Sequence, residues 1–402
     1  MKAASDVLIV GAGLVGLSLA AALSRSHLSV TVVDARAKPI LSSRAAKLRN
    51  GYQLKSGVTP RVSAINPSSV KFLSRIGAWE VIAENRISTF KEMNVWDNRG
   101  TSHIEFGGAG QASPVLGHIV ENQLIEIALI EVLEASGDVT FKWQSDLQEI
   151  VHQELGYAVH FVNGSKAECT LLVGADGGNS RVRELCGLRT VRWSYQQTAL
   201  VTTVETELDH ERTARQCFTN NGPLAFLPLA DQRLCSVVWS VKHADELMSL
   251  KDQEFCELLT ASFENRLGRV LGVDKRFTFG LQQQHALQYI DEQVVLIGDA
   301  AHTIHPLAGQ GANLGFADAN ALAQVLAGAR LEGKSIGAIA VLKSYQRRRQ
   351  SENIVMASAM EFFKRLYDTD NPGINWVRNA GMRLVNSDDR LKSIISKLAA
   401  GR

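Results

Sequence analysis

The chain of 402 residues has few cysteines and almost no net charge, and each shortage excludes a class of protein. The five cysteines, Cys169, Cys186, Cys217, Cys235 and Cys256, lack the spacing of a metal site, and no two of them form a C-x-x-C pair. Neither a metal site, nor a disulfide framework, nor a disulfide reductase is therefore expected, and reduced thiols in a cytosolic chain are the simplest interpretation. With Lys+Arg 43 against Asp+Glu 41, the net charge is +2, so no overall basic field would attract nucleic acid.

The sequence also has few long apolar runs, and the one near the N-terminus has two interpretations. The run VLIVGAGLVGLSLAAAL (residues 7–23) resembles a signal or membrane segment in length. However, a single basic residue precedes it, and its three glycines are spaced as a tight turn requires. We therefore favour a nucleotide-binding turn over a membrane segment, and no other stretch is a candidate span.

The pattern G-x-G-x-x-G at Gly11, Gly13 and Gly16 follows the strand-like run DVLIV. The first glycine permits a tight turn, the second lets the backbone approach a pyrophosphate, and the third lets the helix pack on the strand. A second strand-like run, SVTVVDA, ends at Asp34, at the distance expected for an acidic residue that binds a ribose. The pattern predicts a site for FAD or NAD rather than NADP. The alternative is a strand–turn–helix whose glycines serve packing only.

Two further strand-like runs end in an aspartate. In LLVGADGGNSRVRE (residues 171–184), Asp176 lies at a strand-to-helix turn, for which a capped helix start is the alternative interpretation. In VVLIGDAAH (residues 294–302), Asp299 is suited to bind a chain of sugar-like hydroxyl groups. The stretch HPLAGQGANLGFADA follows, and its glycines expose backbone N–H groups around residues 311–313 at a helix N-terminus. Such a site suits a flat ring whose carbonyl edge becomes anionic on reduction, as in an isoalloxazine.

The order of elements predicts an α/β fold. We expect a Rossmann-like FAD-binding domain formed by residues 1–85, 111–190 and 286–335. A β-rich substrate domain is expected at residues 86–110 and 191–285, and a helical C-terminal region at residues 336–402. Local signals include a helix start at Asn66-Pro67, a hairpin turn at Asn163-Gly164 and a helix over residues 252–267.

These motifs together resemble the single-component FAD-dependent aromatic hydroxylases, which have the para-hydroxybenzoate hydroxylase fold. HPLAGQGANLGFAD is similar to the signature of the ubiquinone-biosynthesis hydroxylases, as are RVSAINPSS, GHIVEN, AFLPL and RRRQSEN. The similarity extends over essentially the whole chain. RVSAIN, NVWD, LGHIVEN and LCSVVWS are most similar to the bacterial 2-polyprenylphenol hydroxylase branch.

The resemblance implies an FAD-dependent aromatic monooxygenase of ubiquinone biosynthesis. In this class NAD(P)H reduces a tightly but not covalently bound FAD and leaves. O2 then gives a flavin C4a-hydroperoxide, which transfers one oxygen to the ring of a polyprenylated phenol. The protein orients and shields the flavin. Because no second G-x-G-x-x-G is present, a transient nicotinamide site near Asp176 is implied, with the choice of NADH or NADPH open.

The resemblance also implies roles for individual residues. Gly11, Gly13 and Gly16 would approach the FAD pyrophosphate, and Asp34 would hold the adenosine ribose. Asp176 would contribute to both FAD and nicotinamide binding. This chain departs from the related sequences at Gln123, where they often carry arginine. The remaining cofactor contacts would be Arg61 and Asn122 at the phosphate or ribityl region, Asp299 at the ribityl chain, and Pro306, Gly309, Gln310, Gly311, Ala312 and Asn313 along the flavin ring.

The general acid or base is not evident from the sequence. His302 and His305 flank the glycine-rich loop and, with Pro306, are the candidates for the catalytic centre. A lone histidine is more often a satisfied structural group, so a structural role is the favoured alternative for both. Three aromatic residues of the substrate domain either line a ring pocket or pack its core: Phe218, Phe226 and Trp239.

The C-terminal stretch has apolar residues at helical spacing (Leu391, Ile394, Ile395 and Leu398) among basic residues. A cytoplasmic protein in peripheral contact with the inner face of the membrane is one interpretation. The other is a helix packed on its own protein or on a second subunit, in a homo-oligomer or a biosynthetic assembly. The helix is too short and too charged to span a bilayer.

Other functions remain open at this stage. They are hydroxylation of another ring carbon of the ubiquinone pathway or of a soluble phenol, another flavin oxidoreductase such as a dehydrogenase, and a non-catalytic flavoprotein subunit of an assembly. An open channel long enough for a prenyl chain would favour the lipid substrate over a soluble one. A purified protein without a yellow flavin spectrum would favour the non-catalytic subunit.

Overall fold

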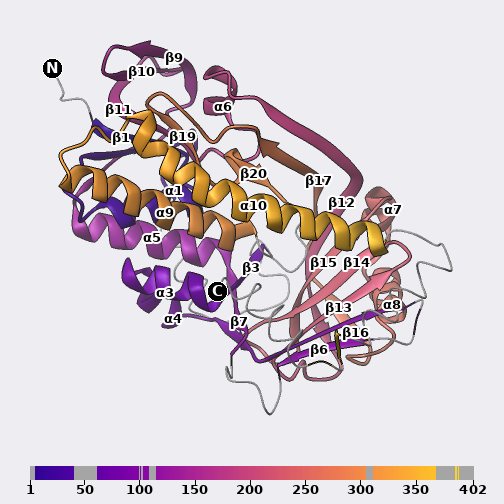
Figure 1. The fold of residues 1–402 in the computed structure, drawn as a ribbon. Helices are drawn as coiled ribbons and strands as arrows, with labels where there is room; N and C mark the ends of the chain where they lie inside the picture. Colours follow the sequence, from indigo (N-terminus) through magenta and orange to yellow (C-terminus); the bar gives the residue numbers. More distant parts are fainter. Residues whose placement is uncertain are drawn as a thin grey trace.

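The computed structural model has two large β-sheets with helices packed against them (Figure 1). It describes residues 5–39, 61–98, 100, 103–107, 115–304, 311–367, 385–386 and 388. Each sheet has its own core of buried apolar side chains, which is the arrangement expected for an α/β domain with a β-rich companion.

The first sheet has eight strands in the order β18-β19-β11-β1-β2-β8, with β10 paired to β11 and β9 paired to β10. Its central strands are parallel, and their apolar runs are buried on both faces, as parallel sheets require. The strands are β1 (Ser5–Val10), β2 (Val30–Val33), β8 (Val139–Lys142), β9 (Leu147–Gln153), β10 (Gly156–Phe161), β11 (Lys166–Gly174), β18 (Ile290–Asp291) and β19 (Val294–Leu296).

Helices α1 (Leu14–Leu23), α5 (Asn122–Ser136) and α9 (Gly311–Leu331) lie side by side against this sheet (Figure 1). The long helix α10 (Ile339–Tyr367) packs on α9 and extends towards the second sheet. Shorter helices complete this part of the chain: α3 (Pro67–Arg75), α4 (Ala78–Ala83) and α6 (Arg181–Leu185).

The second sheet has nine mostly antiparallel strands, ordered β20-β17-β12-β15-β14-β13-β5-β6, with β16 paired to β12. Helices α7 (Ala244–Ser249) and α8 (Asp252–Ser262) cover one of its faces. The strands are β5 (Glu92–Asp97), β6 (His103–Gly107), β12 (Thr190–Thr206), β13 (Thr213–Thr219), β14 (Gly222–Pro228), β15 (Leu234–Val241), β16 (Val270–Val273), β17 (Phe277–Ala286) and β20 (His302–Thr303).

A small antiparallel sheet links the two parts. It consists of β3 (Val62–Ile65), β7 (Gly117–Glu121) and β4 (Ser88–Phe90), in the order β3-β7-β4. Its buried Phe90 and Ile119 pack with Leu229 and Leu234 of the substrate domain, while β3 contacts α9. The small sheet therefore holds its residues at the junction of the two large sheets.

Most local expectations are confirmed. The side chain of Asn66 accepts a hydrogen bond from the Ser69 N–H and caps α3, and β10 and β11 form a hairpin around Asn163-Gly164. The helix expected over residues 252–267 is wrong at its end, because α8 stops at Ser262 and the next turn has left-handed backbone at Glu264 and Asn265. The residue boundaries given above for the two domains stay a prediction.

No helix in the described part of the chain has the length and apolar character needed to cross a membrane. The apolar run near the N-terminus instead forms β1, a turn and α1. Of the C-terminal amphipathic stretch, residues 371–402, the structure describes residues 385, 386 and 388, and residues 391–402 with the apolar positions lie outside the described residues.

Candidate functional site

The register of the parallel strands brings the three aspartate-bearing strand ends to one edge of the eight-stranded sheet. Val10 is paired with both Val33 and Gly174, and Gly174 is paired with Leu296. Because carboxyl ends of neighbouring parallel strands meet at the same edge, the turns that follow are adjacent, which is where ligands bind in open α/β sheets. Motifs separated by almost 300 residues thus form one site.

Each of the three glycines of the first motif is explained by a different contact or space in the structure. Gly11 has φ +110°, and a Cβ there would lie 2.4 Å from the Ala175 carbonyl oxygen. A Cβ on Gly16 would lie 2.0 Å from the Gly11 oxygen, so α1 could not pack as it does. A Cβ on Gly13 would meet nothing within 4 Å, although this residue is the N-cap of α1. The space beside Gly13 and the free N–H groups of the first turn suit an anion.

The Asp34 carboxylate lies beside this turn. It accepts hydrogen bonds from the Ala12 N–H at 2.8 Å and from the backbone N–H and the Nε of Arg36. Burial alone would raise the pKa of Asp34, but these hydrogen bonds outweigh it, so the pKa lies below its usual value and the group is an anion. Arg36 also pairs with Glu126, at 2.9 Å.

The second motif is anchored from both sides. Asp176 accepts hydrogen bonds from the Ser180 hydroxyl and from the Arg181 and Val182 N–H groups at the start of α6, whose N-cap residue is Ser180. The cofactor role of Asp176 stays a prediction. The buried Arg183 donates to the Ala300 carbonyl oxygen and to a carbonyl of the Asp176 turn. Arg183 therefore joins the second motif to the third.

The third motif carries an accessible carboxylate. Asp299 is exposed, although its neighbours Gly298 and Ala300 are buried. The exposed Asp299 carboxylate is suited to accept hydrogen bonds from hydroxyl groups of a ligand.

Arg61 and Asn122 are held together by the small sheet. The Asn122 N–H donates to the Arg61 carbonyl oxygen at 3.0 Å, and the Ser63 hydroxyl donates to the Asn122 Oδ1 at 2.7 Å. The Arg61 guanidinium lies over the Phe279 ring, 5.3 Å from its centroid. Arg61 therefore stands between the eight-stranded sheet and the nine-stranded sheet.

Helix α9 presents its N-terminus to the same region, beginning at Gly311, where a Cβ would meet nothing within 4 Å. The Asn313 side chain is buried; its Oδ1 accepts from the Asn66 N–H and the Ser69 hydroxyl, and its Nδ2 donates to the Ala64 carbonyl oxygen. It fixes α9 to β3 and α3. The predicted residues His305, Pro306, Gly309 and Gln310 lie outside the described residues.

One face of the nine-stranded sheet faces this region. Val201 of β12 pairs with Phe277 of β17, which lies two positions before Phe279 and therefore points to the same side of the sheet. The side chains of Val201 and Phe279 thus lie on the face that carries Arg61. The cross-strand row continues through Val238 and Ala225, which are half-buried. This row of modest apolar side chains, called the apolar wall below, lies between Ser236 and Ser240 of β15 and beside Gln216 of β13, on the face towards the predicted cofactor segments.

The comparisons with known proteins agree with this geometry. A family model described as an FAD binding domain matches residues 53–358, and one described as an FAD dependent oxidoreductase matches residues 6–91. The chain is 34% identical to the 3-demethoxyubiquinol 3-hydroxylase of Escherichia coli, over 99% of this chain and 98% of that protein. It is 33% identical to the mouse ubiquinone biosynthesis monooxygenase COQ6, over 98% of this chain and 90% of that protein.

The chain belongs to the FAD-dependent hydroxylases of ubiquinone biosynthesis.

Solved structures support the fold of this hydroxylase. The p-nitrophenol 4-monooxygenase PnpA of Pseudomonas putida aligns over all of both chains with a TM-score of 0.78 and 19% identity. Klebsiella pneumoniae HpxO, solved with FAD and uric acid, aligns over 98% of this chain and 97% of its own with a TM-score of 0.72 and 17% identity. The protein is an FAD-dependent aromatic monooxygenase, and NAD(P)H is the electron donor typical of this class.

The residues present fit FAD. The space beside Gly13 and the α1 N-terminus suit the pyrophosphate, and the anionic Asp34 suits the adenosine ribose. The open Asp299 carboxylate suits the ribityl hydroxyls, and the N-terminus of α9 suits the carbonyl edge of the ring.

Phe226 and Trp239 lie on the opposite face of the nine-stranded sheet from this wall, whereas Phe218 lies on the same face as Ala225. Phe226 and Trp239 belong to the core under α8, where the Phe226 and Phe263 rings are 3.9 Å apart between centroids. Phe218 packs with Met360 of α10. Of the two roles considered for Phe226 and Trp239, core packing is confirmed.

The sequence interpretation missed a polar cluster. His302 is 3% exposed, and its Nε2 lies 2.5 Å from the Oδ2 of Asp318, a fully buried carboxylate of α9. Arg349 and Asn353 of α10 bind the other oxygen of Asp318. Two signals pointed to this cluster: an aspartate within the apolar run GFADANALA, and an arginine and an asparagine four residues apart in RRRQSEN. The catalytic role predicted for His302 stays a prediction.

Proposed function

We propose that this hydroxylase uses NAD(P)H and O2 to hydroxylate the ring of a polyprenylated phenol, a ubiquinone precursor of the 2-polyprenylphenol type. The observation that carries the proposal is the apolar row of Val201, Val238 and Ala225, on the face that carries Arg61. An apolar wall stabilises an aromatic ring and its prenyl chain by excluding water from them.

In this proposal, different predicted residues bind different parts of FAD. Backbone N–H groups of α1 and the space at Gly13 bind the pyrophosphate, while Asp34 and Asp299 bind the ribose and ribityl hydroxyls. The α9 N-terminus, at residues 311–313, stabilises negative charge on the ring edge. FAD, when bound, accepts a hydride from NAD(P)H and activates O2. The apolar row holds the phenol in position and keeps water away.

A second candidate substrate comes from the bacterial relative, whose name specifies 3-demethoxyubiquinol. The name of that relative places its hydroxylation at carbon 3 of the ring. Comparison of the two substrates assigns the ring carbon.

The test is NAD(P)H oxidation by the FAD-loaded protein with short-chain 2-prenylphenol, with short-chain 3-demethoxyubiquinol and with soluble 4-hydroxybenzoate, each with NADH and with NADPH. We expect the prenylphenol to stimulate oxidation and to gain one oxygen by mass spectrometry. Stimulation by the demethoxyubiquinol alone would assign the second candidate. Stimulation by 4-hydroxybenzoate alone would refute a lipid substrate.

Peripheral membrane contact through residues 391–402, and a homo-oligomer or biosynthetic assembly, remain part of the proposal. Binding of the protein to anionic vesicles, with and without these residues, tests the first. Light scattering of the purified protein tests the second.

A further inference from the structure

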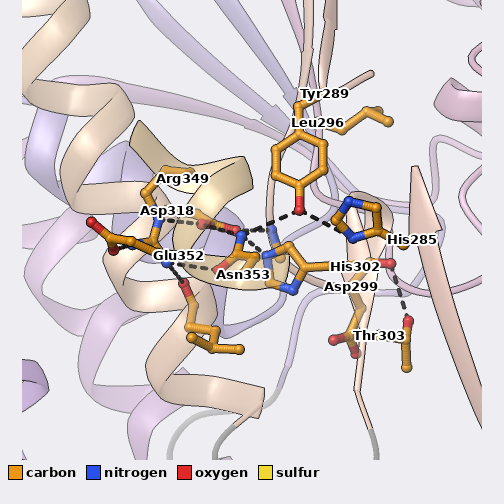
Figure 2. A network of polar contacts seen from close by, with 12 residues as sticks. His285, Tyr289, Leu296, Asp299, His302, Thr303, Asp318, Arg349, Glu352 and Asn353 are labelled. Atoms are coloured by element: carbon orange, nitrogen blue, oxygen red, sulfur yellow. Dashed lines mark hydrogen bonds and ion pairs between the residues drawn. The ribbon is translucent and has the colours of Figure 1, made fainter. Parts of the chain in front are cut away.

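A buried polar cluster lies where α9, α10 and β20 meet (Figure 2). Asp318 is fully buried and receives hydrogen bonds from His302 at 2.5 Å, from the Arg349 Nε at 2.7 Å and from Asn353 at 3.3 Å. Asn353 also donates to the Tyr289 hydroxyl at 3.4 Å. Burial alone would raise the pKa of Asp318, but His302 and Arg349 lower it to about 2, so the group is an anion.

The same carboxylate binds the backbone of the third motif. The Gly298 N–H donates to the Asp318 Oδ2 at 3.0 Å, directly before Asp299. From the other side, the Arg349 guanidinium donates to the carbonyl oxygen of Leu314, in the first turn of α9. Asp318 therefore connects the turn that carries Asp299 with the helix whose N-terminus begins at Gly311.

Stability alone does not account for this cluster. A buried ion pair gains little over well-packed apolar side chains, because the cost of desolvating both charges offsets their attraction. Charged side chains held in a fixed geometry instead give a defined orientation to the segments that they join. The two segments joined here are those expected to contact the ribityl chain and the ring of FAD.

We propose that Asp318 and His302 are positioning residues that fix the Gly298–Asp299 turn against α9, so that both segments contact one flavin. The inference rests on the flavin site of the proposed function. His302 acts in it through Asp318: its Nε2–H donates to the carboxylate and holds the Oδ2 in place for the Gly298 N–H. It is buried and touches neither substrate nor cofactor in this role.

A pair of variants tests the inference in the holoenzyme. His302→Leu removes the donor to Asp318, whereas His302→Gln keeps an N–H near the position of Nε2. The readout is the dissociation constant of FAD, measured by the rise of flavin fluorescence on dilution, together with the visible flavin spectrum. We expect H302L to bind FAD about tenfold more weakly and H302Q to retain most of the wild-type affinity, since only the first removes one of the two hydrogen-bond donors to the buried Asp318 Oδ2.

Two controls separate positioning from general stability. Glu352→Gln removes the exposed partner of the same Arg349 and should leave FAD affinity unchanged. Phe255→Leu destabilises the core beneath the nine-stranded sheet, far from both segments, and should lower the Tm without changing the affinity for FAD.

The result that overturns the inference is an H302L variant with wild-type FAD affinity, or an F255L variant that loses FAD to the same extent. Equal losses in H302Q and H302L would also refute it, because the hydrogen bond would then be irrelevant. Failure of the proposed function is a different result, since it would appear as a wild-type protein that binds FAD but oxidises no prenylated phenol.

Discussion

Two glycines of the first motif should respond to the same substitution in opposite ways. A Cβ on Gly16 would lie 2.0 Å from the Gly11 carbonyl oxygen, a backbone atom that cannot move aside alone. Gly13 has φ −84°, which any residue adopts, and its Cβ would meet no protein atom within 4 Å. Gly16→Ala should therefore damage the fold, whereas Gly13→Ala should damage only the binding of a ligand.

The magnitudes follow from these contacts. Overpacking at Gly16 should cost about 1–3 kcal/mol of the free energy of unfolding. Alanine in place of glycine at the N-cap position of Gly13 should cost less than about 1 kcal/mol. For FAD binding we expect the larger effect at Gly13, because a methyl group there occupies the space that the backbone leaves open for the pyrophosphate. A loss of about 1.4 kcal/mol of binding free energy would weaken FAD binding tenfold.

The assay is thermal unfolding of both variants with FAD removed, followed by titration with FAD and detection of flavin fluorescence. G16A should unfold at a lower temperature than wild type, and G13A close to the wild-type temperature but with weakened FAD binding. If G13A bound FAD as tightly as wild type, the space beside Gly13 would not be the pyrophosphate site and our reasoning would be refuted.

Three other outcomes are expected. Ala225→Phe should fill the apolar wall and abolish NAD(P)H oxidation stimulated by a prenylated phenol without changing FAD affinity, while Val162→Phe, at a hairpin turn where Val162 is 65% exposed, should change neither; equal effects would contradict the wall. Phe226→Leu should cost about 1–3 kcal/mol in urea unfolding with an unchanged KM for substrate, because Phe226 packs under α8; a raised KM would place it at the site instead. The pKa of Asp318 is lowered from 3.8 to about 2, so its ionised form contributes about 2 kcal/mol of stability above pH 4, which is lost as the pH falls towards 2. The difference in unfolding free energy between wild type and D318N should therefore narrow over that range; a constant difference would show that folding does not lower the pKa of Asp318.

Local chemistry explains which parts of the site could be predicted from the sequence. Gly11 and Asp34 belong to a strand–turn–helix–strand unit whose geometry is set within about 30 residues. The interior position of β1, β11 and β19 in the sheet then follows from burial of apolar strands on both faces, and their parallel pairing brings the three motifs to one edge.

The parts that could not be predicted depend on contacts between distant segments. Asp318 and Arg349 are 31 residues apart on different helices, and no spacing rule connects them. Gly315, a glycine of the stretch HPLAGQGANLGFADA, admits Val15 of α1, since a Cβ there would lie 2.4 Å from the Val15 Cγ2. Its role is the close packing of α9 on α1.

This division also explains why the cofactor is easier to infer than the substrate. In the proposed site, FAD is held largely by backbone N–H groups and strand-end carboxylates, which leave glycine and aspartate patterns in the sequence. The proposed substrate wall consists of Val201, Val238 and Ala225, residues that any sheet contains, and only their register across β12, β15 and β14 makes them neighbours. Relatives with the same glycine patterns can therefore act on different rings by changing side chains in this row. The ring specificity of this hydroxylase should accordingly respond to exchanges at Val238 and Ala225 that leave FAD binding untouched, and a specificity that responded only to changes in the flavin-binding motifs would contradict this view.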